Sequence, residues 1–151
     1  MHIVRELDLE ASPERTFEFL DDLERYPAWM RLVHEATSVD SAASDPPDTR
    51  AWIVELQAQV GPFARSKRLR MVRTEHDRPN RVRFERHEVD GRSHAPWTLD
   101  AELVGRTDNA SHLTMTLSYG GSLWTGAVLQ RVLDDAVTRG SDELVRQLAE
   151  G

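Results

Sequence analysis

The segment from Ser122 to Glu150 constrains the fold most, because its apolar residues recur at three- and four-residue spacing. In a helix of 3.6 residues per turn, this spacing gathers the apolar side chains on one side. A stripe this broad must pack against a comparably apolar surface, so the sequence predicts a long terminal helix lying on a sheet. The stripe comprises Trp124, Val128, Leu129, Val132, Leu133, Ala136, Val137, Leu144, Val145 and Leu148.

A glycine interrupts this predicted helix at position 140. Glycine in a helix interior costs about 1 kcal/mol relative to alanine. Either the helix bends at Gly140, or a neighbouring group packs close to its backbone there. Both explanations stay open from the sequence.

Composition limits the kind of protein that the chain forms. A length of 151 residues, with 39% hydrophobic and 30% charged residues, predicts one ordered domain over 1–151. The net charge of −7 argues against binding to nucleic acid or anionic membranes. The absence of cysteine fits a cytoplasmic location and excludes disulfides. No apolar run approaches the roughly 20 residues that a membrane span needs, so we expect no stable membrane insertion.

The first thirty residues predict one strand and two short helices. His2 to Glu10 alternates between apolar and polar residues, with Arg5 interrupting the apolar face. Ser12-Pro13-Glu14 is typical of a helix start. A second short helix runs towards Tyr26, and Pro27 is expected to end it.

Six further strands are expected between Val33 and Tyr119, and their turns fix the pairing. The Gly61-Pro62 turn sets Trp52 opposite Met71, and the turn at 77–80 sets Arg73 opposite Phe84. An Asp90-Gly91 hairpin would set Phe84 opposite Trp97 and Arg86 opposite Ala95. All three turns place the large apolar residues on one face of the sheet.

The predicted fold class is α+β, in the order β-α-α-β6-α. A curved seven-stranded antiparallel sheet would wrap the long C-terminal helix, with the short helices closing one end. Such a wrap leaves an interior cavity, and a mostly apolar cavity is a ligand site by default.

Three stretches of the sequence carry a family resemblance: residues 12–17 (SPERTF), residues 22–30 (DLERYPAWM) and the glycine-led terminal helix. They resemble the START-like (SRPBCC) superfamily of polyketide cyclase/dehydrase and lipid-transport type, also called helix-grip. The middle stretch is similar to the "acid, x, x, Tyr/Trp-Pro-x-aromatic" signature of bacterial cyclase-like and coenzyme-Q-binding members. The resemblance covers essentially the whole chain and implies a cavity for a hydrophobic or polyaromatic molecule such as a lipid, quinone or polyketide.

Large apolar residues on the cavity face are candidates for ligand contact. They form either a wall for stacking on an aromatic ligand or ordinary core against the terminal helix. Trp29 and Met30 would either gate the cavity entrance or cap the core. The candidates on the strands are Trp52, Met71, Phe84, Trp97, Met115 and Tyr119.

Charged residues fall on the same face, where they are rare unless paired. Arg73 and Arg86 either bind a carboxylate, enolate or phenolate of the ligand, or join an ion-pair network at the surface. The second interpretation, a solvated salt-bridge rim, applies above all to Arg65, Lys67 and Glu88.

No metal site, cofactor or catalytic constellation is predicted. His87 and His94 would face each other across the Asp90-Gly91 hairpin, but only Glu85 is near enough to be a third ligand. We therefore interpret these histidines as a surface pair.

Three functions are compatible with the sequence. The first is non-catalytic binding of a hydrophobic small molecule. The alternative is a polyketide aromatase/cyclase or dehydrase, in which Arg86 or Arg73 stabilises an enolate and Tyr119 or a water moves a proton. The third is a co-chaperone-like partner that uses the outer sheet. Whether a reaction is catalysed, and whether the chain forms a homodimer, are left open.

Overall fold

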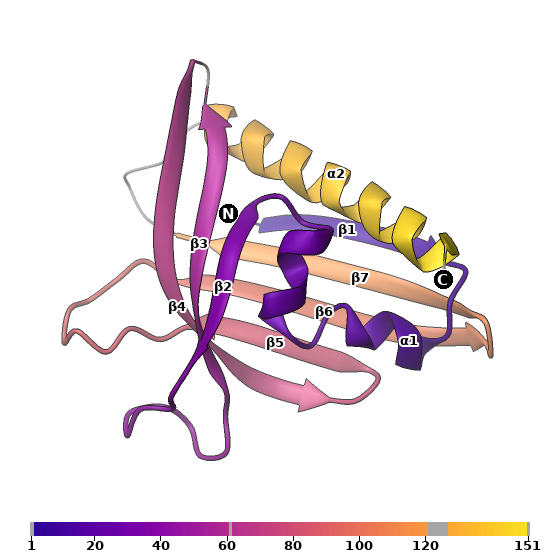
Figure 1. The fold of residues 1–151 in the computed structure, drawn as a ribbon, viewed down its shortest axis with the longest axis horizontal. Coiled ribbons are helices and arrows are strands. Elements are labelled where there is room, and N and C mark those ends of the chain that lie inside the picture. Colours follow the sequence, from indigo (N-terminus) through magenta and orange to yellow (C-terminus); the bar gives the residue numbers. More distant parts are fainter. Residues whose placement is uncertain (1, 61, 121–126, 151) are drawn as a thin grey trace.

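The computed structural model describes residues 2–60, 62–120 and 127–150, and these form seven strands and three helices (Figure 1). The helices are α1 (Pro13–Glu18), the 3₁₀ helix η1 (Leu23–Ala28) and α2 (Ala127–Glu150). The strands are β1 (His2–Leu9), β2 (Val33–Val39), β3 (Ala51–Val60), β4 (Phe63–Asp77), β5 (Arg81–Arg86), β6 (Trp97–Thr107) and β7 (Ala110–Tyr119).

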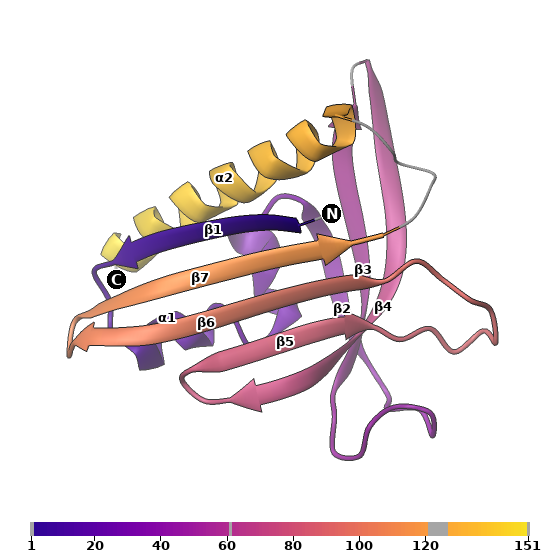
Figure 2. The ribbon, with the colours of Figure 1, turned by 180° about the vertical axis from the view of Figure 1, so that it is seen from behind.

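The strands form one antiparallel sheet in the order β1-β7-β6-β5-β4-β3-β2. The β3–β4 hairpin runs across the direction of β5, β6 and β7, so the sheet is strongly bent (Figures 1 and 2). The bend follows from the right-handed twist of long antiparallel strands. A seven-stranded sheet with a C-terminal helix packed against it confirms the predicted fold class.

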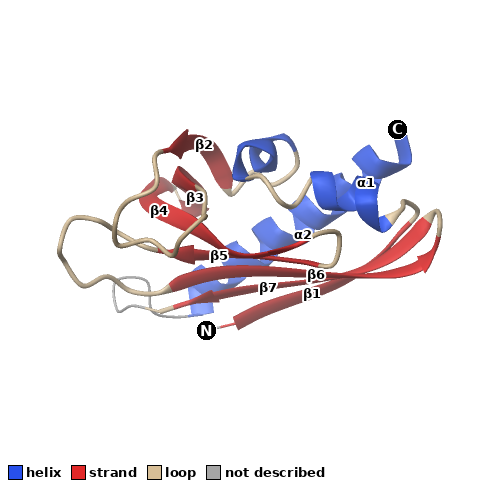
Figure 3. Cartoon of the chain, turned by 90° about the horizontal axis from the view of Figure 1, so that it is seen from below, coloured by secondary structure: helices blue, strands red, loops and turns tan. Residues whose placement is uncertain are grey.

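The helices shape the concave side of this sheet. The terminal helix α2 contacts β1 and β3, while α1 contacts β6 and β7, and η1 contacts β2. Figure 3 shows α1 and η1 together on one side of the sheet. The sheet and α2 therefore enclose the space between them, and η1 closes one side of it. No helix in the described parts of the chain is long and apolar enough to cross a membrane.

Capping side chains begin the two short helices. The Ser12 hydroxyl accepts a hydrogen bond from the Arg15 N–H at 3.2 Å, as predicted for a helix start. The predicted end of the second helix was wrong, because η1 continues through Pro27 to Ala28. Beyond the proline, the N–H groups of Trp29 and Met30 both donate to the Tyr26 carbonyl oxygen, at 3.0 and 2.7 Å.

The apolar stripe of α2 is confirmed for its described half. Leu133, Val137, Leu144 and Leu148 are buried against the sheet. Val145 is 39% exposed, so its place in the stripe was wrong; one residue after Leu144, it is turned about 100° around the helix. Trp124 lies outside the described residues, as do the side chains of Val128, Leu129 and Val132.

Two features that broke the sequence patterns are explained by contacts with α2. A Cβ placed on Gly140 would lie 2.6 Å from Met30 Sδ and 3.3 Å from Met30 Cα, so close packing accounts for the glycine. Arg5 interrupts the apolar face of β1 because its guanidinium donates to the Thr138 hydroxyl. The same guanidinium lies 4.0 Å from the Asp134 carboxylate.

Two of the three predicted registers are confirmed and one was wrong. Trp52 pairs with Met71, and Arg73 pairs with Phe84. Phe84 pairs with Leu99, however, two residues from the predicted partner Trp97. The β5–β6 ladder ends at the Glu85–Thr98 pair, and residues 87–96 form a wide loop before β6. The His87 N–H donates to Arg70 O at 3.0 Å, so the start of this loop stays beside β4. A shift of two residues preserves the faces, since side chains alternate with period two.

Candidate functional site

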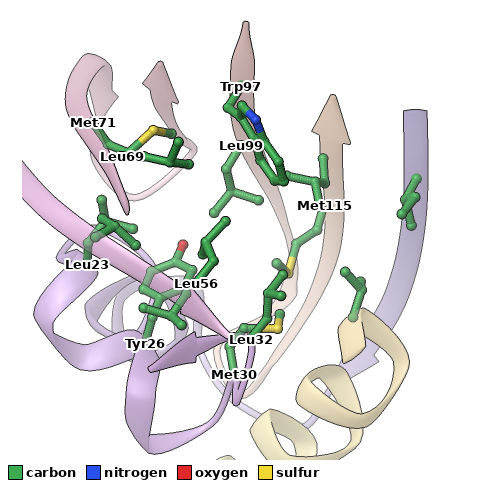
Figure 4. Close-up of a pocket in the computed structure, with 15 residues that line it drawn as sticks. Leu23, Tyr26, Met30, Leu32, Leu56, Leu69, Met71, Trp97, Leu99 and Met115 are labelled. Atoms are coloured by element: carbon green, nitrogen blue, oxygen red, sulfur yellow. The ribbon is translucent and has the colours of Figure 1, made fainter. Parts of the chain in front are cut away.

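An apolar cavity lies between the sheet, η1 and α2 (Figure 4). Its volume is about 60 Å³. Its wall carries residues from β1, β2, β3, β4, β6 and β7 as well as from η1 and α2, so segments from both ends of the chain contribute to it. The lining residues are Ile3, Leu23, Tyr26, Met30, Leu32, Val33, Val54, Leu56, Leu69, Met71, Trp97, Leu99, Met115, Leu117 and Val137.

The cavity wall offers almost no polar atoms to a ligand. Tyr26 is fully buried and its hydroxyl donates to the Leu20 carbonyl oxygen at 2.8 Å. Burial raises the pKa of Tyr26, with a further contribution from the negative charge of Asp21, so the phenol stays protonated at neutral pH. The described residues of the cavity wall therefore suit an apolar group.

A smaller hollow of about 30 Å³ adjoins the cavity beside the β3–β4 hairpin. Leu32, Leu56 and Trp97 line both spaces, so the two are neighbours across these side chains. Among the described residues, charged side chains line the smaller hollow and not the main cavity. The other lining residues of the smaller hollow are Ala58, Arg65, Ser66, Lys67 and Leu133.

Trp97 lies at the boundary between the two spaces, and Figure 4 shows it at the opposite end of the cavity from Met30 and Leu32. Its ring stacks on Tyr119, with centroids 5.1 Å apart and planes 27° apart. The Lys67 ammonium lies 5.9 Å from the centroid of the same ring. Trp97 is thereby held between an aromatic ring and a cation at the end of the cavity where polar groups begin.

Of the eight strand residues predicted for ligand contact, Met71, Trp97 and Met115 line the cavity. Trp52 and Phe84 are fully buried, and their rings meet edge to face at 79° with centroids 5.5 Å apart. The structure therefore places this pair in packed core, where it presents no flat wall for stacking. Tyr119 supports the Trp97 ring from behind and is not among the lining residues.

The two predicted arginines lie outside the cavity wall. Arg73 donates to the Asp21 carbonyl oxygen at 2.9 Å, and its guanidinium lies 5.8 Å from the Trp52 ring centroid. Arg86 pairs with Glu88 at 2.7 Å. It also donates to the Ala95 carbonyl oxygen at 3.2 Å, and so braces the loop 87–96. The geometry favours the ion-pair interpretation for Arg86 and Glu88.

Trp29 and Met30 occupy different places at the predicted entrance. Met30 lines the cavity and packs against Gly140. Trp29 is buried, with its indole N–H donating to Phe19 O at 3.2 Å, and it borders an outer groove between η1 and α2. Leu32 lines the cavity, the smaller hollow and this groove, and Ala58 lines the last two, so these side chains lie between the interior and the outside.

Sequence reasoning missed the aliphatic majority of the wall. Val54, Leu56, Leu69, Leu99 and Leu117 share a sheet face with the predicted aromatic residues, so the strand alternation could have identified them. No such pattern marks Leu23 or Leu32, because both lie in short irregular segments around η1.

Within residues 2–60, 62–120 and 127–150, no cluster of three or more metal-ligating side chains could hold a metal ion. His94 instead bonds Asp90 at 2.8 Å and lies 3.3 Å from an Arg86 nitrogen. The expected facing of His87 and His94 across a tight hairpin was wrong, because residues 87–96 form a wide loop.

The sequence model of the family "Polyketide cyclase / dehydrase and lipid transport" matches residues 1–150. The chain belongs to this family. A comparison with curated proteins gives no match. Membership of the family agrees with an apolar interior cavity and specifies neither a ligand nor a reaction.

Solved structures share the fold at low sequence identity. A START superfamily protein from Mycobacterium smegmatis superposes with a TM-score of 0.74 at 12% identity, over 99% of this chain and 97% of that one. A protein from Thermus thermophilus superposes with a TM-score of 0.73 at 17% identity, over 99% of this chain and 98% of that one. The Zhui aromatase/cyclase from Streptomyces sp. R1128 superposes with a TM-score of 0.70 at 10% identity, over 99% of this chain and 93% of that one. These likenesses establish the START, or helix-grip, fold.

Proposed function

We propose that this protein binds a hydrophobic small molecule, of lipid, quinone or polyketide type, in the cavity between the sheet and α2. The observation that carries the proposal is an interior space with an almost wholly apolar wall. Concave apolar sites with a few polar groups at one end are the usual form of small-molecule sites. Membership of the polyketide cyclase/dehydrase and lipid-transport family supports the same function.

Flexible side chains allow this cavity to widen around a ligand. The chain has four methionines, and Met30, Met71 and Met115 all line the cavity. Methionine has three rotatable side-chain bonds and adapts its shape to irregular partners. A space of about 60 Å³ holds only a few waters, because each water needs about 10–15 Å³. We infer that a larger ligand enters by displacing these methionine side chains and Leu32.

The cyclase alternative needs a group in the cavity that moves a proton or stabilises an enolate. Arg73 and Arg86 bond to protein oxygens outside the wall, and the Tyr26 hydroxyl is committed to Leu20 O. These contacts support binding over chemistry.

A cytoplasmic location stays a prediction.

Calorimetric titration with two neutral apolar probes, 2-acetylnaphthalene and dodecan-1-ol, tests the proposal. Binding in the cavity buries apolar surface and should give a negative heat-capacity change. Leu99→Trp fills the cavity and should weaken binding at least about tenfold, whereas Val104→Trp, on the exposed outer face of the same strand, should leave it unchanged. Binding that survives Leu99→Trp in a folded variant would contradict the proposal.

A further inference from the structure

We propose that Lys67 and the indole N–H of Trp97 bind the anionic end of the ligand, a carboxylate, while its apolar body occupies the main cavity. This inference rests on the proposed function, because it assumes that the cavity takes an apolar molecule. It adds the chemical class of the ligand, which is an amphiphile with a negatively charged end.

The position of Lys67 follows from the β3–β4 register. Lys67 pairs with Leu56, and its ammonium lies 5.9 Å from the Trp97 ring centroid. Lys67 and Trp97 both line the smaller hollow, and Trp97 and Leu56 also line the main cavity. A molecule lying across Leu56 and the Trp97 ring would therefore place one end in apolar surroundings and the other beside the ammonium.

The side chains of Lys67 and Trp97 each carry hydrogen-bond donors without an acceptor among the described residues. Trp97 is 7% exposed, and its buried Nε1 has no hydrogen-bond partner in the described part of the chain. Buried indole N–H groups usually find a partner, because an unmet donor in an apolar environment is unfavourable. Lys67 forms no hydrogen bond or ion pair with any residue in 2–60, 62–120 or 127–150. Its ring contact with Trp97 leaves the ammonium protons available.

Lys67 differs from the two arginines that lie near Glu88, because both of those form ion pairs. Arg86 is bonded to Glu88 at 2.7 Å, and Arg70 is bonded to Asp45 at 2.6 Å. Desolvation and the positive charge of Arg86 lower the pKa of Lys67, against an opposing effect of Glu88. A bound anion would offset both effects, because an opposite charge within a few ångströms favours the charged amine.

The geometry favours a carboxylate over a neutral polar end. Lysine and the indole nitrogen only donate hydrogen bonds, so the matching group must accept them. Charge-assisted hydrogen bonds are roughly twice as strong as neutral ones. One cation and one N–H match the two oxygens of a carboxylate. The small volume of the hollow, about 30 Å³, also favours a compact group.

The test compares matched probes on the full chain by calorimetry at neutral pH. The pairs are dodecanoate with dodecan-1-ol, and 2-naphthoate with 2-acetylnaphthalene. The protein variants are Lys67→Met, which keeps an apolar stem without the charge, and Trp97→Phe, which keeps a ring without the N–H. Arg68→Met is the control, because Arg68 is the exposed next residue on the opposite face of β4.

We expect Lys67→Met to lower the affinity for both carboxylate probes about tenfold, while the affinity for the neutral probes changes less than about twofold. Trp97→Phe should also lower the affinity for the carboxylate probes more than the affinity for the neutral probes. Arg68→Met should leave the affinity for both kinds of probe unchanged. If Lys67→Met and Arg68→Met affect the carboxylates equally, the inference is wrong while the proposed function stands. If none of the four probes binds the wild type, the proposed function fails and the inference fails with it.

Discussion

Met30 Sδ occupies the position that a side chain on Gly140 would need, 2.6 Å from an ideal Cβ there. This contact joins the segment after η1 to the middle of α2. Met30 also lines the cavity, so the contact lies between α2 and the cavity wall. The glycine is therefore required by packing, and the described part of α2 accommodates it as continuous helix from Ala127 to Glu150.

Gly140→Ala should consequently lower the free energy of unfolding by about 1–3 kcal/mol through overpacking, although alanine is the better helix former. Chemical denaturation of Gly140→Ala, Met30→Ala and the double variant measures the coupling. In the Met30→Ala background the contacts with Sδ and Cε are gone and only the backbone contact with Cα at 3.3 Å remains, so Gly140→Ala should destabilise the protein less than it does in the wild type. A stabilising effect of Gly140→Ala in the wild-type background would show that Met30 does not restrict this position.

A buried ion pair fastens the loop between β2 and β3. Arg70 binds both carboxylate oxygens of Asp45, at 2.7 and 2.6 Å, and also donates to Asp40 O and His87 O. The two side chains are only 5% and 1% exposed. Asp45→Asn leaves a buried positive charge without its partner and should destabilise the protein by about 3 kcal/mol.

Thermal and urea unfolding of Asp45→Asn check this prediction. Asp48→Asn is the matched control, since Asp48 is exposed in the same loop and asparagine tolerates its positive φ of 58°. Equal stability of the two variants would mean that the Arg70–Asp45 pair contributes little.

His112 connects β7 to β1 in a way that depends on pH. Its Nδ1 lies 2.8 Å from Asp8 and its Nε2 lies 3.3 Å from Glu6, and these hydrogen bonds raise the pKa of His112. A raised folded-state pKa gives stabilisation that is complete below the unfolded value of about 6.5 and disappears as pH rises through the folded value. The same contact lowers the pKa of Asp8, so that carboxylate remains ionised in mild acid.

The difference in Tm between wild type and His112→Gln should therefore be larger at about pH 5.5 than at about pH 8.5. His34→Gln, at an exposed position on β2, serves as the control. A difference that is the same at both pH values would show that protonated His112 does not stabilise the β1–β7 pair.

Arg86 allows the two interpretations of the charged residues to be separated. Because its guanidinium bonds Glu88 and Ala95 O outside the cavity wall, Arg86→Ala should lower Tm and leave the affinity for 2-naphthoate within about twofold. Lys67→Met should lower the affinity for 2-naphthoate and leave Tm unchanged. If Arg86→Ala lowers the affinity for 2-naphthoate but not Tm, Arg86 contacts the ligand.

The fold could be predicted because several independent patterns agreed. The turns after Val60 and Asp77 fixed the pairing of Trp52 with Met71 and of Arg73 with Phe84, and the alternation placed apolar residues on one face. The third turn misled because Asp90-Gly91 makes a local turn, with the Asp90 carboxylate accepting from the Arg92 N–H, inside a loop that does not pair. Pairing of Trp97 with Tyr119 on β7 fixes the position of β6.

The cavity wall was harder to predict than the sheet. Alternation identifies the face but does not distinguish packed core, where Trp52 and Phe84 lie, from wall, where Leu99 and Met115 lie. That distinction depends on where η1 and α2 sit above the sheet, which strand periodicity does not encode. Likewise, Arg86 and Lys67 share a face, but only the three-dimensional contacts show that Arg86 is paired.

The central claim is that an apolar molecule occupies the space between the sheet and α2. A crystal structure with 2-bromonaphthalene, located by the anomalous signal of bromine, tests it most directly. We predict bromine density inside the wall formed by Met71, Leu99 and Met115, with the methionine side chains displaced to make room. Bromine found only in the outer groove beside Trp29, or an unoccupied and unchanged cavity at saturating probe, would contradict the account.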